Sequence, residues 1–488
     1  MKKRALISST LIVLLLTSVY LLRIYKQKTT DPIVCADCNV IIVSLSNLRK
    51  KNMSFYGSSR NTTPVIDAFF KDSFSFDHAI APASLTFSDA ASFFFSLQTM
   101  THKFMNRTDK DIALDVLKKY KSFPKVLAGK GYNTAAFVSD EDYKYENGIG
   151  AEFGLYFDKS KYEENAIAFQ PWQYNVGTND LVKPAVKWLR DNHKEKFFLF
   201  FQAYDMHCPY TPRGKFKELF SMPHNPKIDF TACYMNLDKI EVIKKGNKTY
   251  YKLFKWASFL NKEEDVGVLF EQRDLDYLIA LYDAELANAD DNLRELFLEI
   301  KNLKLEKNTI VIFMSEHGDY LGENGYFMKV AVTGQGNLHN ANLSYPLMIN
   351  YPPLKGAYKQ KQMVQTIDFA PTILQMLGFD VPEGMQGKSF LKMLGNDQEL
   401  NDYAFSAAIR KRHFRDKGQF NVQAVQNREW KYNFYEHRDF EGNVVESEEN
   451  LYNLLNDPEE KIELRDIEKD KLTMMRKVRL EKRSLYSK

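Results

Sequence analysis

Runs of apolar residues alternate with helical patterns along most of the chain. Residues 39–45 (NVIIVSL) form a continuous, β-branched apolar run, which is typical of a strand buried on both faces of a parallel sheet. The other predicted strands are residues 133–140, 196–205, 308–319 and 345–352. Helices are predicted where apolar residues recur every three or four positions, at residues 63–72, 123–132, 181–192, 274–303 and 367–379.

Strands that are separated by helices predict a parallel sheet covered by helices on both faces. In such α/β folds, ligands and chemistry collect at the carboxyl ends of the strands. After about residue 400 the pattern changes to short alternating segments, such as AFSAAIRKRH and NREWKYNFY. We therefore predict an α/β domain over residues 29–400, and a small antiparallel C-terminal subdomain with a basic tail over residues 401–488.

The first 28 residues have the pattern of a membrane segment and not of a folded domain. An almost uncharged apolar run extends from Ala5 to Leu22, close to the ~17–25 residues that span a bilayer. No small-residue cleavage motif follows it, whereas Arg23, Lys26 and Lys28 do. We predict an uncleaved, single-pass signal-anchor with the main domain on the extracytoplasmic side of the membrane; the alternative is a cleaved signal peptide.

Composition and charge narrow the range of partners. The 488 residues include 67 Lys and Arg and 63 Asp and Glu, which gives a net charge of +4. Because the two signs are mixed along the chain, no basic stripe indicates a nucleic-acid partner. Cys35 and Cys38 have redox or metal spacing, but the absence of a second such pair disfavours a zinc ribbon. Together with Cys208 and Cys233 they allow one or two disulfides outside the cytoplasm, and their pairing stays open.

Polar side chains follow several of the predicted elements. Ser46 and Asn47 follow the first strand, His207 follows the third, and the fourth ends in a polar stretch that includes Glu316 and His317. Each of these residues alone is most often a turn former, a helix cap or a satisfied structural group. Their occurrence at several strand ends indicates a shared site. Thr86 lies in a turn of small residues (APASLTFSDAAS) that is predicted to begin a helix.

These segments together resemble the sulfatase family of the alkaline-phosphatase superfamily, in order from about residue 38 to about residue 465. The matching segments include IIVSLSNLRKKNMSFYG, AGKGYNTAAFVSD, FFLFFQAYDMHCPYTP, NTIVIFMSEHGDYLGENG, TIDFAPTILQMLGFDVPEGMQGKSF and NLYNLLNDPEE. The resemblance implies a mixed, mainly parallel sheet sandwiched by helices, with a small antiparallel α+β subdomain at the C-terminus.

The family's chemistry needs a divalent cation, because an anionic ester repels nucleophiles until positive charge neutralises it. It also needs a Cys or Ser that is converted to formylglycine within a C/S-x-P-S-R motif. By the resemblance, Ser46 replaces a metal-binding Asp and is followed by Asn47, and Glu316 replaces another Asp while His317 is kept. The nucleophile position falls on Thr86, and the rest of the motif falls on Ser88, Asp89 and Ala90. Formylglycine is therefore not expected.

The substrate side of the site is also altered. The family's sulfate-facing Lys falls on Gln335, whereas His207 is retained. We therefore predict Thr86 and His207 at catalytic positions. The predicted metal positions are Glu316, His317, Asn47 and Ser46, and the predicted substrate-binding positions are Gln335, His339 and Asp89.

Two functions remain open from the sequence. The first is a non-catalytic, sulfatase-like membrane protein without a cofactor, which binds a glycan, an anionic ester or a partner at the old cleft. The second is an active sulfuric-ester or phosphoester hydrolase or phosphotransferase that uses Thr86 as nucleophile on zinc, calcium or magnesium. The concerted change of four site positions favours the first. Hydrogen bonds of Glu316 and His317 with Ser46 and Asn47 would support it, whereas bound metal would support the second.

Overall fold

The computed structural model describes residues 34–487, except for residues 105–109, 144–147, 159–175, 236–239, 256–266, 329–337, 355, 397 and 413–417. The predicted signal-anchor at residues 1–28 lies outside the described residues. Within the described part of the chain, no helix is both long enough and apolar enough to cross a membrane.

A sheet of eight strands forms the centre of the molecule. Its strand order is β12-β2-β11-β10-β1-β5-β3-β4. β1 (Asn39–Leu45) pairs in parallel with β10 (Thr309–Met314) on one side and with β5 (Phe197–Ala203) on the other. The other strands are β2 (Phe74–Ile80), β3 (Asn133–Val138), β4 (Leu155–Asp158), β11 (Leu347–Asn350) and β12 (Tyr358–Gln365). β11 runs antiparallel to both of its neighbours, so the predicted mixed, mainly parallel sheet is confirmed.

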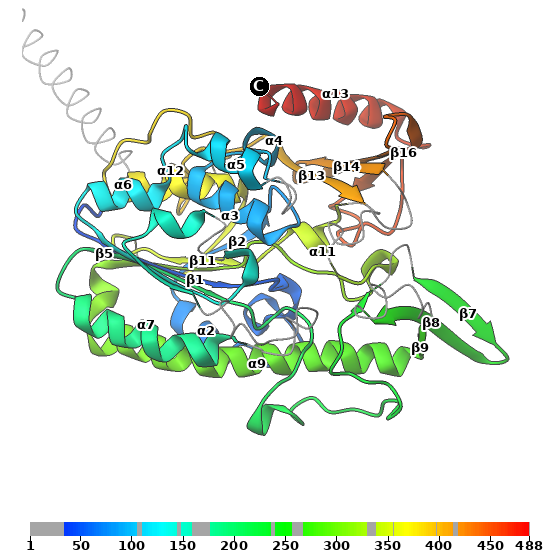
Figure 1. Cartoon of the computed structure of the whole chain (residues 1–488), viewed down its shortest axis with the longest axis horizontal. Coiled ribbons are helices and arrows are strands. Elements are labelled where there is room, and N and C mark those ends of the chain that lie inside the picture. The colour runs from blue at the N-terminus through cyan, green and yellow to red at the C-terminus, as the bar shows by residue number, and fades with distance from the viewer. Residues whose placement is uncertain are drawn as a thin grey trace, which may run out of the picture.

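Helices cover both faces of this sheet (Figure 1). α3 (Thr86–Phe95), α6 (Phe123–Gly129) and α12 (Phe369–Met376) lie on one face. α2 (Pro64–Phe70), α7 (Thr178–Asn192) and α9 (Gln272–Asn302) lie on the other. In β1, Val40 and Ile42 pack into the first of these cores, and Ile41 and Val43 pack into the second. The continuous apolar run of β1 follows from this burial on both faces.

A second sheet of four antiparallel strands follows residue 403 and confirms the predicted C-terminal architecture. Its strands are β13 (Ala404–Arg412), β14 (Gly418–Gln426), β15 (Trp430–Arg438) and β16 (Val444–Asn453), in that order. The basic C-terminal stretch forms α13 (Lys469–Tyr486), which buries Met475 against Trp430 and Tyr432. Figure 1 shows α13 lying across this sheet.

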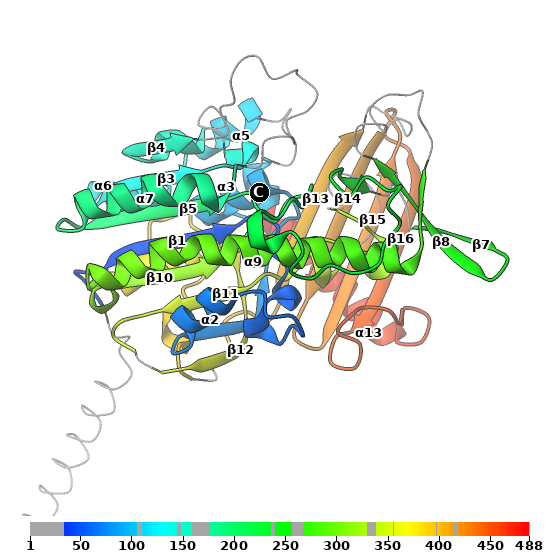
Figure 2. The same ribbon diagram turned by 90° about the horizontal axis from the view of Figure 1, so that it is seen from below.

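A hairpin projects from the α/β domain near the N-terminal end of α9 (Figure 2). It contains β7 (Glu241–Lys245) and β8 (Lys248–Lys255), and β6 (Tyr234–Met235) and β9 (Val268–Phe270) pair with β8. Disulfides join Cys208 to Cys233 and Cys35 to Cys38, which settles the pairing that the sequence left open.

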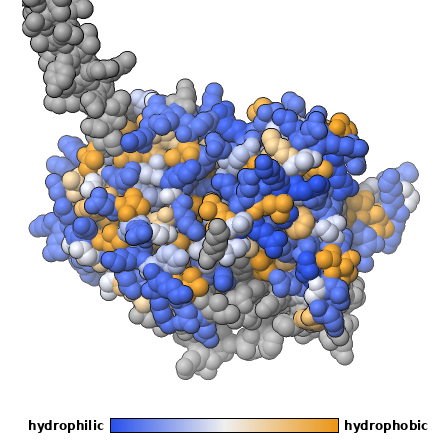
Figure 3. Space-filling view, turned by 90° about the horizontal axis from the view of Figure 1, so that it is seen from above, coloured by the Kyte–Doolittle hydropathy of each residue, from blue (hydrophilic) through white to orange (hydrophobic). Residues whose placement is uncertain are grey.

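The remaining α-helices are α4 (Thr99–His102), α5 (Lys110–Leu117) and α11 (Asn340–Leu343). Short 3-10 helices are Lys50–Asn52, Ser54–Tyr56, Glu141–Tyr143, Ile149–Glu152, Gly214–Phe216, Leu305–Lys307, Glu323–Gly325, Thr366–Asp368 and Leu391–Met393. Seen from the side of α3 and α12, the surface is largely hydrophilic, with apolar side chains scattered among the polar ones (Figure 3).

Candidate functional site

The predicted site residues meet at the carboxyl edge of the central sheet. Ser46 and Asn47 directly follow β1, Glu316 and His317 come just after β10, and Thr86 is the first residue of α3. Because β1 and β10 are parallel neighbours, their carboxyl ends lie side by side. Thr86, Ser46 and His317 are fully buried, and Glu316 is nearly so.

Ser46 joins two carboxylates. Its Oγ lies 2.5 Å from Glu316 Oε1 and 2.9 Å from Asp140 Oδ2. Ser44 Oγ donates a further hydrogen bond to Glu316 Oε2 at 3.2 Å. A serine hydroxyl carries one proton, so the two carboxylates share it as a donor. Asp140 was not predicted as a site residue. Its signal in the sequence was its place two residues after β3, which parallels the place of Ser46 after β1.

Asn47 turns the chain out of β1. Its φ of 61° lies in the left-handed region, which Asn tolerates better than most residues. Its Nδ2 donates to Asp319 Oδ2 at 3.2 Å, and its carbonyl oxygen accepts from Tyr282 Oη at 3.1 Å. Asn47 therefore serves as an anchored turn residue beside the site, with its amide oriented by a buried carboxylate.

Thr86 and His317 form a second pair. Thr86 Oγ1 lies 3.4 Å from His317 Nε2, and His317 Nδ1 lies 2.6 Å from the Gly318 carbonyl oxygen. A carbonyl oxygen only accepts, so Nδ1 carries the proton and Nε2 is left to accept from the threonine hydroxyl. A hydroxyl beside an oriented imidazole is the arrangement that activates a nucleophile.

Neither Thr86 nor Ser88 occupies the N-cap position of α3. Leu85 occupies the N-cap position, and an aliphatic side chain offers no capping oxygen. The hydroxyl of Ser88 donates instead to the carbonyl oxygen of Phe104. The hydroxyl of Thr86 faces His317, whose Nε2 lies 3.4 Å away.

The other predicted residues make different contacts. His207 Nδ1 lies 2.8 Å from the Cys208 carbonyl oxygen, and its ring stacks on Tyr204 at 4.5 Å. His339 lies at the start of α11, and its Nδ1 is 2.9 Å from Tyr320 Oη. Asp89 Oδ1 accepts from the Ala83 amide at 3.0 Å and so ties α3 to the turn before it. Gln335 lies outside the described residues.

The residues present do not fit the divalent cation that the resemblance implies. A calcium ion sits about 2.3–2.6 Å from each of six to eight oxygens. Ser46, Glu316 and Asp140 instead approach one another at hydrogen-bond separations, with a hydroxyl donor between the carboxylates. Among the residues with described positions, no three His, Cys, Asp or Glu side chains are grouped so as to hold a metal ion.

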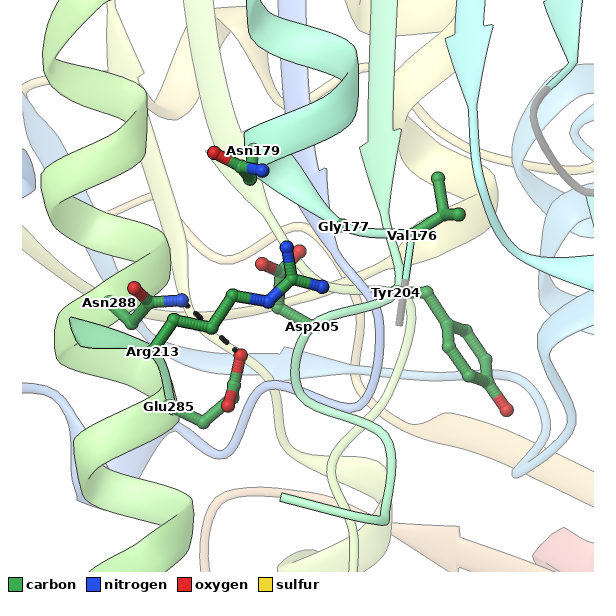
Figure 4. A pocket seen from close by; sticks show the side chains of 8 residues that line it. All are labelled: Val176, Gly177, Asn179, Tyr204, Asp205, Arg213, Glu285 and Asn288. Atoms are coloured by element: carbon green, nitrogen blue, oxygen red, sulfur yellow. Dashed lines mark hydrogen bonds between the residues drawn. The ribbon is translucent and has the colours of Figure 1, made fainter. Parts of the chain in front are cut away.

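A second group of charged residues lies behind the carboxyl end of β5 (Figure 4). Asp205 accepts from the backbone N–H and the hydroxyl of Thr178, each at 2.8 Å. A Cβ at Gly177 would lie 2.4 Å from Asp205 Oδ1, so this close approach requires glycine. Burial, with the neighbouring charge of Asp205, raises the pKa of Glu285 to about 8. Arg213 lies beside both carboxylates and moderates this effect.

Comparison with known families agrees with the fold. A family model described as sulfatase matches residues 38–379. A second model, described as the C-terminal region of N-sulphoglucosamine sulphohydrolase, matches residues 322–485.

Individual relatives are distant. The chain is 22% identical over 431 residues to an N-acetylglucosamine-6-O-sulfatase of Bacteroides thetaiotaomicron, which covers 76% of this chain and 72% of that protein. It is 28% identical over 199 residues to arylsulfatase K of Canis lupus familiaris, which covers 39% of this chain and only 34% of that protein.

Solved structures share the fold over nearly the whole chain. One was determined in complex with its substrate D-glucosamine-2-N,6-O-disulfate. It has a TM-score of 0.67 and 17% identity, and covers 92% of this chain and 98% of that chain. The phosphonate monoester hydrolase of Agrobacterium radiobacter has a TM-score of 0.63 and 16% identity. The match covers 91% of this chain and 93% of that chain. At these identities the likeness concerns the fold.

Proposed function

This chain belongs to the sulfatase family, and from that premise we propose that it is a membrane-anchored member that binds a sulfated glycan at its ester cleft without hydrolysing it. The observation that carries the proposal is the hydrogen bond from Ser46 to Glu316. Where the family places a metal-binding carboxylate, this chain places a hydroxyl that bonds to the remaining carboxylate. A cleft without its cation loses the charge that makes an anionic ester susceptible to attack.

The substrate positions support the same proposal. Thr86 stands where the family has the residue converted to formylglycine, and Gln335 stands where it has a sulfate-facing lysine. The glycan class is inferred from the relatives, one of which is an N-acetylglucosamine-6-O-sulfatase, while one structural neighbour holds a disulfated glucosamine. The membrane anchor is inferred from the apolar run from Ala5 to Leu22.

A second candidate function rests on the contact between Thr86 and His317. In it, the protein is an ester hydrolase or phosphotransferase in which His317 Nε2 removes the proton of Thr86 Oγ1 as that oxygen attacks the ester. The 3.4 Å separation is longer than the about 2.6–3.2 Å expected of a working pair, although such contacts often tighten when substrate binds.

Turnover assays separate the two candidates. Purified full-length wild type, Thr86→Ala and His317→Ala are tested on an aryl sulfate and a bis-aryl phosphate, with zinc, calcium, magnesium or a chelator. The matched control is Thr249→Ala, which changes an exposed threonine on the β8 hairpin. We expect no turnover by any of the four proteins and no stoichiometric metal in elemental analysis. Turnover by wild type and Thr249→Ala that is lost in the other two would establish the second candidate.

Membrane attachment has its own test. We expect full-length protein to sediment with membranes and to stay there in high salt, because about 18 apolar residues hold a chain in a bilayer through burial and not through charge. N-terminal sequencing of natively expressed protein checks the anchor directly. A mature chain that begins near Asp31 would show that the segment is a cleaved signal peptide.

A further inference from the structure

Residues 34–38, which we call the entry segment, lie at the amino edge of the central sheet. The Cys35 N–H donates to the carbonyl oxygen of Met376, the last residue of α12, at 2.7 Å, and a disulfide joins Cys35 to Cys38. Tyr132, in the turn before β3, donates to the Cys38 carbonyl oxygen at 2.8 Å. The first residue of the segment is 46% exposed, so the segment reaches the surface at the edge where β1 and β3 begin.

The candidate site lies at the opposite edge of the same sheet. Ser46 follows the last residue of β1, and Thr86 and His317 lie at the same carboxyl edge. β1 has seven residues, which places its two ends about 20–23 Å apart. In Figures 1 and 2 the first, dark blue residues of the described chain lie at one end of the long axis, and β13–β16 lie toward the other.

The connection to the proposed membrane anchor is short. Residues 23–33, which we call the tether, join the apolar run to the entry segment. Its 11 residues span at most about 36–40 Å, even when fully extended. The entry segment adds no length to the tether, because its disulfide and its main-chain hydrogen bonds hold it against the sheet.

The tether is shorter than the folded body is wide. A compact body of residues 34–488 has a diameter of about 55–60 Å. A chain attached at the amino edge therefore cannot pass around the body and let it turn over, so the carboxyl edge faces away from the bilayer that holds the anchor. Lipid headgroups form a layer only about 5–8 Å thick on each side of a bilayer, and those of the same bilayer do not reach that edge.

We propose that the protein binds its sulfated glycan in trans, on a soluble polymer or a facing surface, and does not bind sulfated lipids of its own bilayer. The assignment rests on the proposed function, both its glycan binding and its membrane anchor, and adds where the partner lies. The position of the entry segment at the amino edge, opposite Thr86 and His317, carries it.

Energy transfer to the membrane tests the orientation. Lys307→Cys lies just before β10 at the amino edge, and Lys245→Cys lies on the projecting β7–β8 hairpin; both positions are exposed. Each variant of the full-length protein is labelled with a donor dye without reduction of the disulfides, and is reconstituted into vesicles with an acceptor-labelled lipid. We expect transfer at least about twofold higher from position 307, because the body between the two dyes is about 55–60 Å wide. Equal transfer would overturn the orientation.

Vesicle clustering tests the partner. Vesicles that hold the full-length protein are mixed with vesicles that display a lipid-coupled, sulfated glucosamine–uronate disaccharide, and light scattering measures clustering. The same lipid is then placed in the protein's own vesicles as a competitor. The matched variant carries about 80 additional Gly and Ser residues after Lys28, which give the tether a root-mean-square length of about 50 Å and a far greater reach when extended.

We expect wild type to cluster the vesicles and to ignore the competitor in its own bilayer, because a tether that cannot span the gap gives an effective concentration near zero. The long-tether variant should lose at least about half of its clustering to the same competitor. Equal loss in both proteins would overturn binding in trans and leave glycan binding intact. Binding of the soluble sulfated disaccharide without any clustering would do the same.

Failure of the proposed function has a separate signature. If wild type neither clusters the vesicles nor binds the soluble disaccharide in calorimetric titration, the glycan-binding function is overturned, and binding in trans with it. If the natively expressed protein lacks the apolar segment and does not remain with the vesicles, the anchor is overturned and the orientation loses its premise, while binding of the soluble disaccharide still measures the glycan site.

Discussion

Ser46 shows how one side chain changes the character of the site. With an aspartate at this position, three buried carboxylates would meet at the carboxyl edge of the sheet, and only a cation could hold them together. The serine hydroxyl removes one negative charge and adds a donor, which bonds to Glu316 and Asp140. The two carboxylates are therefore held by hydrogen bonds at the position that the resemblance assigns to a metal.

Restoring the carboxylate tests this interpretation. Ser46→Asp should lower the melting temperature, because the new charge lies beside Glu316 and Asp140 in a buried site. Millimolar calcium or magnesium should recover much of the loss in this variant and leave wild type unchanged. Differential scanning fluorimetry with and without each cation measures both effects. The control is Ser46→Asn, because asparagine is similar in size to aspartate but carries no charge. Equal stabilisation of wild type by the cation would show that the wild-type residues do hold a cation.

The sequence indicated some of the residues that lie together at the sheet edge and missed others for a physical reason. Ser46, Glu316 and His317 could be predicted because each comes just after a strand with a strong apolar pattern. Asp140 holds the same kind of position, but a lone aspartate after a strand is usually a turn former. Arg49 and Glu460 line one cavity from opposite ends of the chain, and no local pattern reports such a meeting.

Glu285 should make the stability of the protein depend on pH. Burial raises its pKa to about 8 in the folded protein, well above its usual value, so folding favours the protonated form. Its contribution to the free energy of unfolding is therefore complete below about pH 4 and is lost as the pH rises towards 8. Glu285→Gln stays neutral at every pH, so its melting temperature should fall less between pH 5 and pH 8.5 than that of wild type. The exposed Glu306→Gln is the control, and parallel curves for all three proteins would show that Glu285 does not titrate in this range.

At the scale of the elements, apolar patterns predicted the strands with long apolar runs and missed β2, which is largely buried, and β12. β1, β5 and β10 are buried at every position and have unmistakable apolar runs. β12 is an edge strand of the sheet. Its sequence, YKQKQMVQ, is mostly polar, as is typical of edge strands. β12 pairs with β2, a parallel partner 284–285 residues earlier in the chain, and its own sequence does not encode that pairing.

The start of α2 depends on a side chain from another helix. Thr63 occupies the N-cap position without a capping hydrogen bond from its side chain to any described residue. Asp290 of α9 accepts from the N–H groups of Val65 and Ile66 at 2.9 and 2.8 Å instead. Asp290→Ala should therefore lower the free energy of unfolding by about 1–2 kcal/mol, as the loss of a helix cap does. Urea denaturation measures it, and Asp291→Ala, at the neighbouring and more exposed position, should cost less than about 0.5 kcal/mol.

At the scale of the whole molecule, the two sheets are tied together by contacts that no segment predicts alone. Ser406 of β13 donates to the Ala81 carbonyl oxygen at 2.6 Å, and the Ala407 N–H donates to Pro82 at 2.9 Å. Both acceptors lie in the turn that leads to Thr86, so the C-terminal subdomain supports the segment that positions Thr86. The sequence predicted two units, but their junction comes from pairs more than 300 residues apart.

The deepest of these ties is the ion pair of Lys431 with Glu460, whose side chains are 0% and 1% exposed. Glu460 also accepts from the Asn340 N–H, so the pair links β15, the turn after β16 and α11. Lys431→Met leaves the carboxylate buried without its cation and should lower the free energy of unfolding by about 3–5 kcal/mol in urea denaturation. Lys431→Met combined with Glu460→Leu removes both charges and should recover most of that loss, because no buried charge is left uncompensated.

Lys477→Met, in an exposed pair on α13, is the control and should change stability by less than about 1 kcal/mol. If the single and double variants at the buried pair are equally unstable, the pair contributes packing and not charge compensation. The junction would then be held by the backbone contacts of β13.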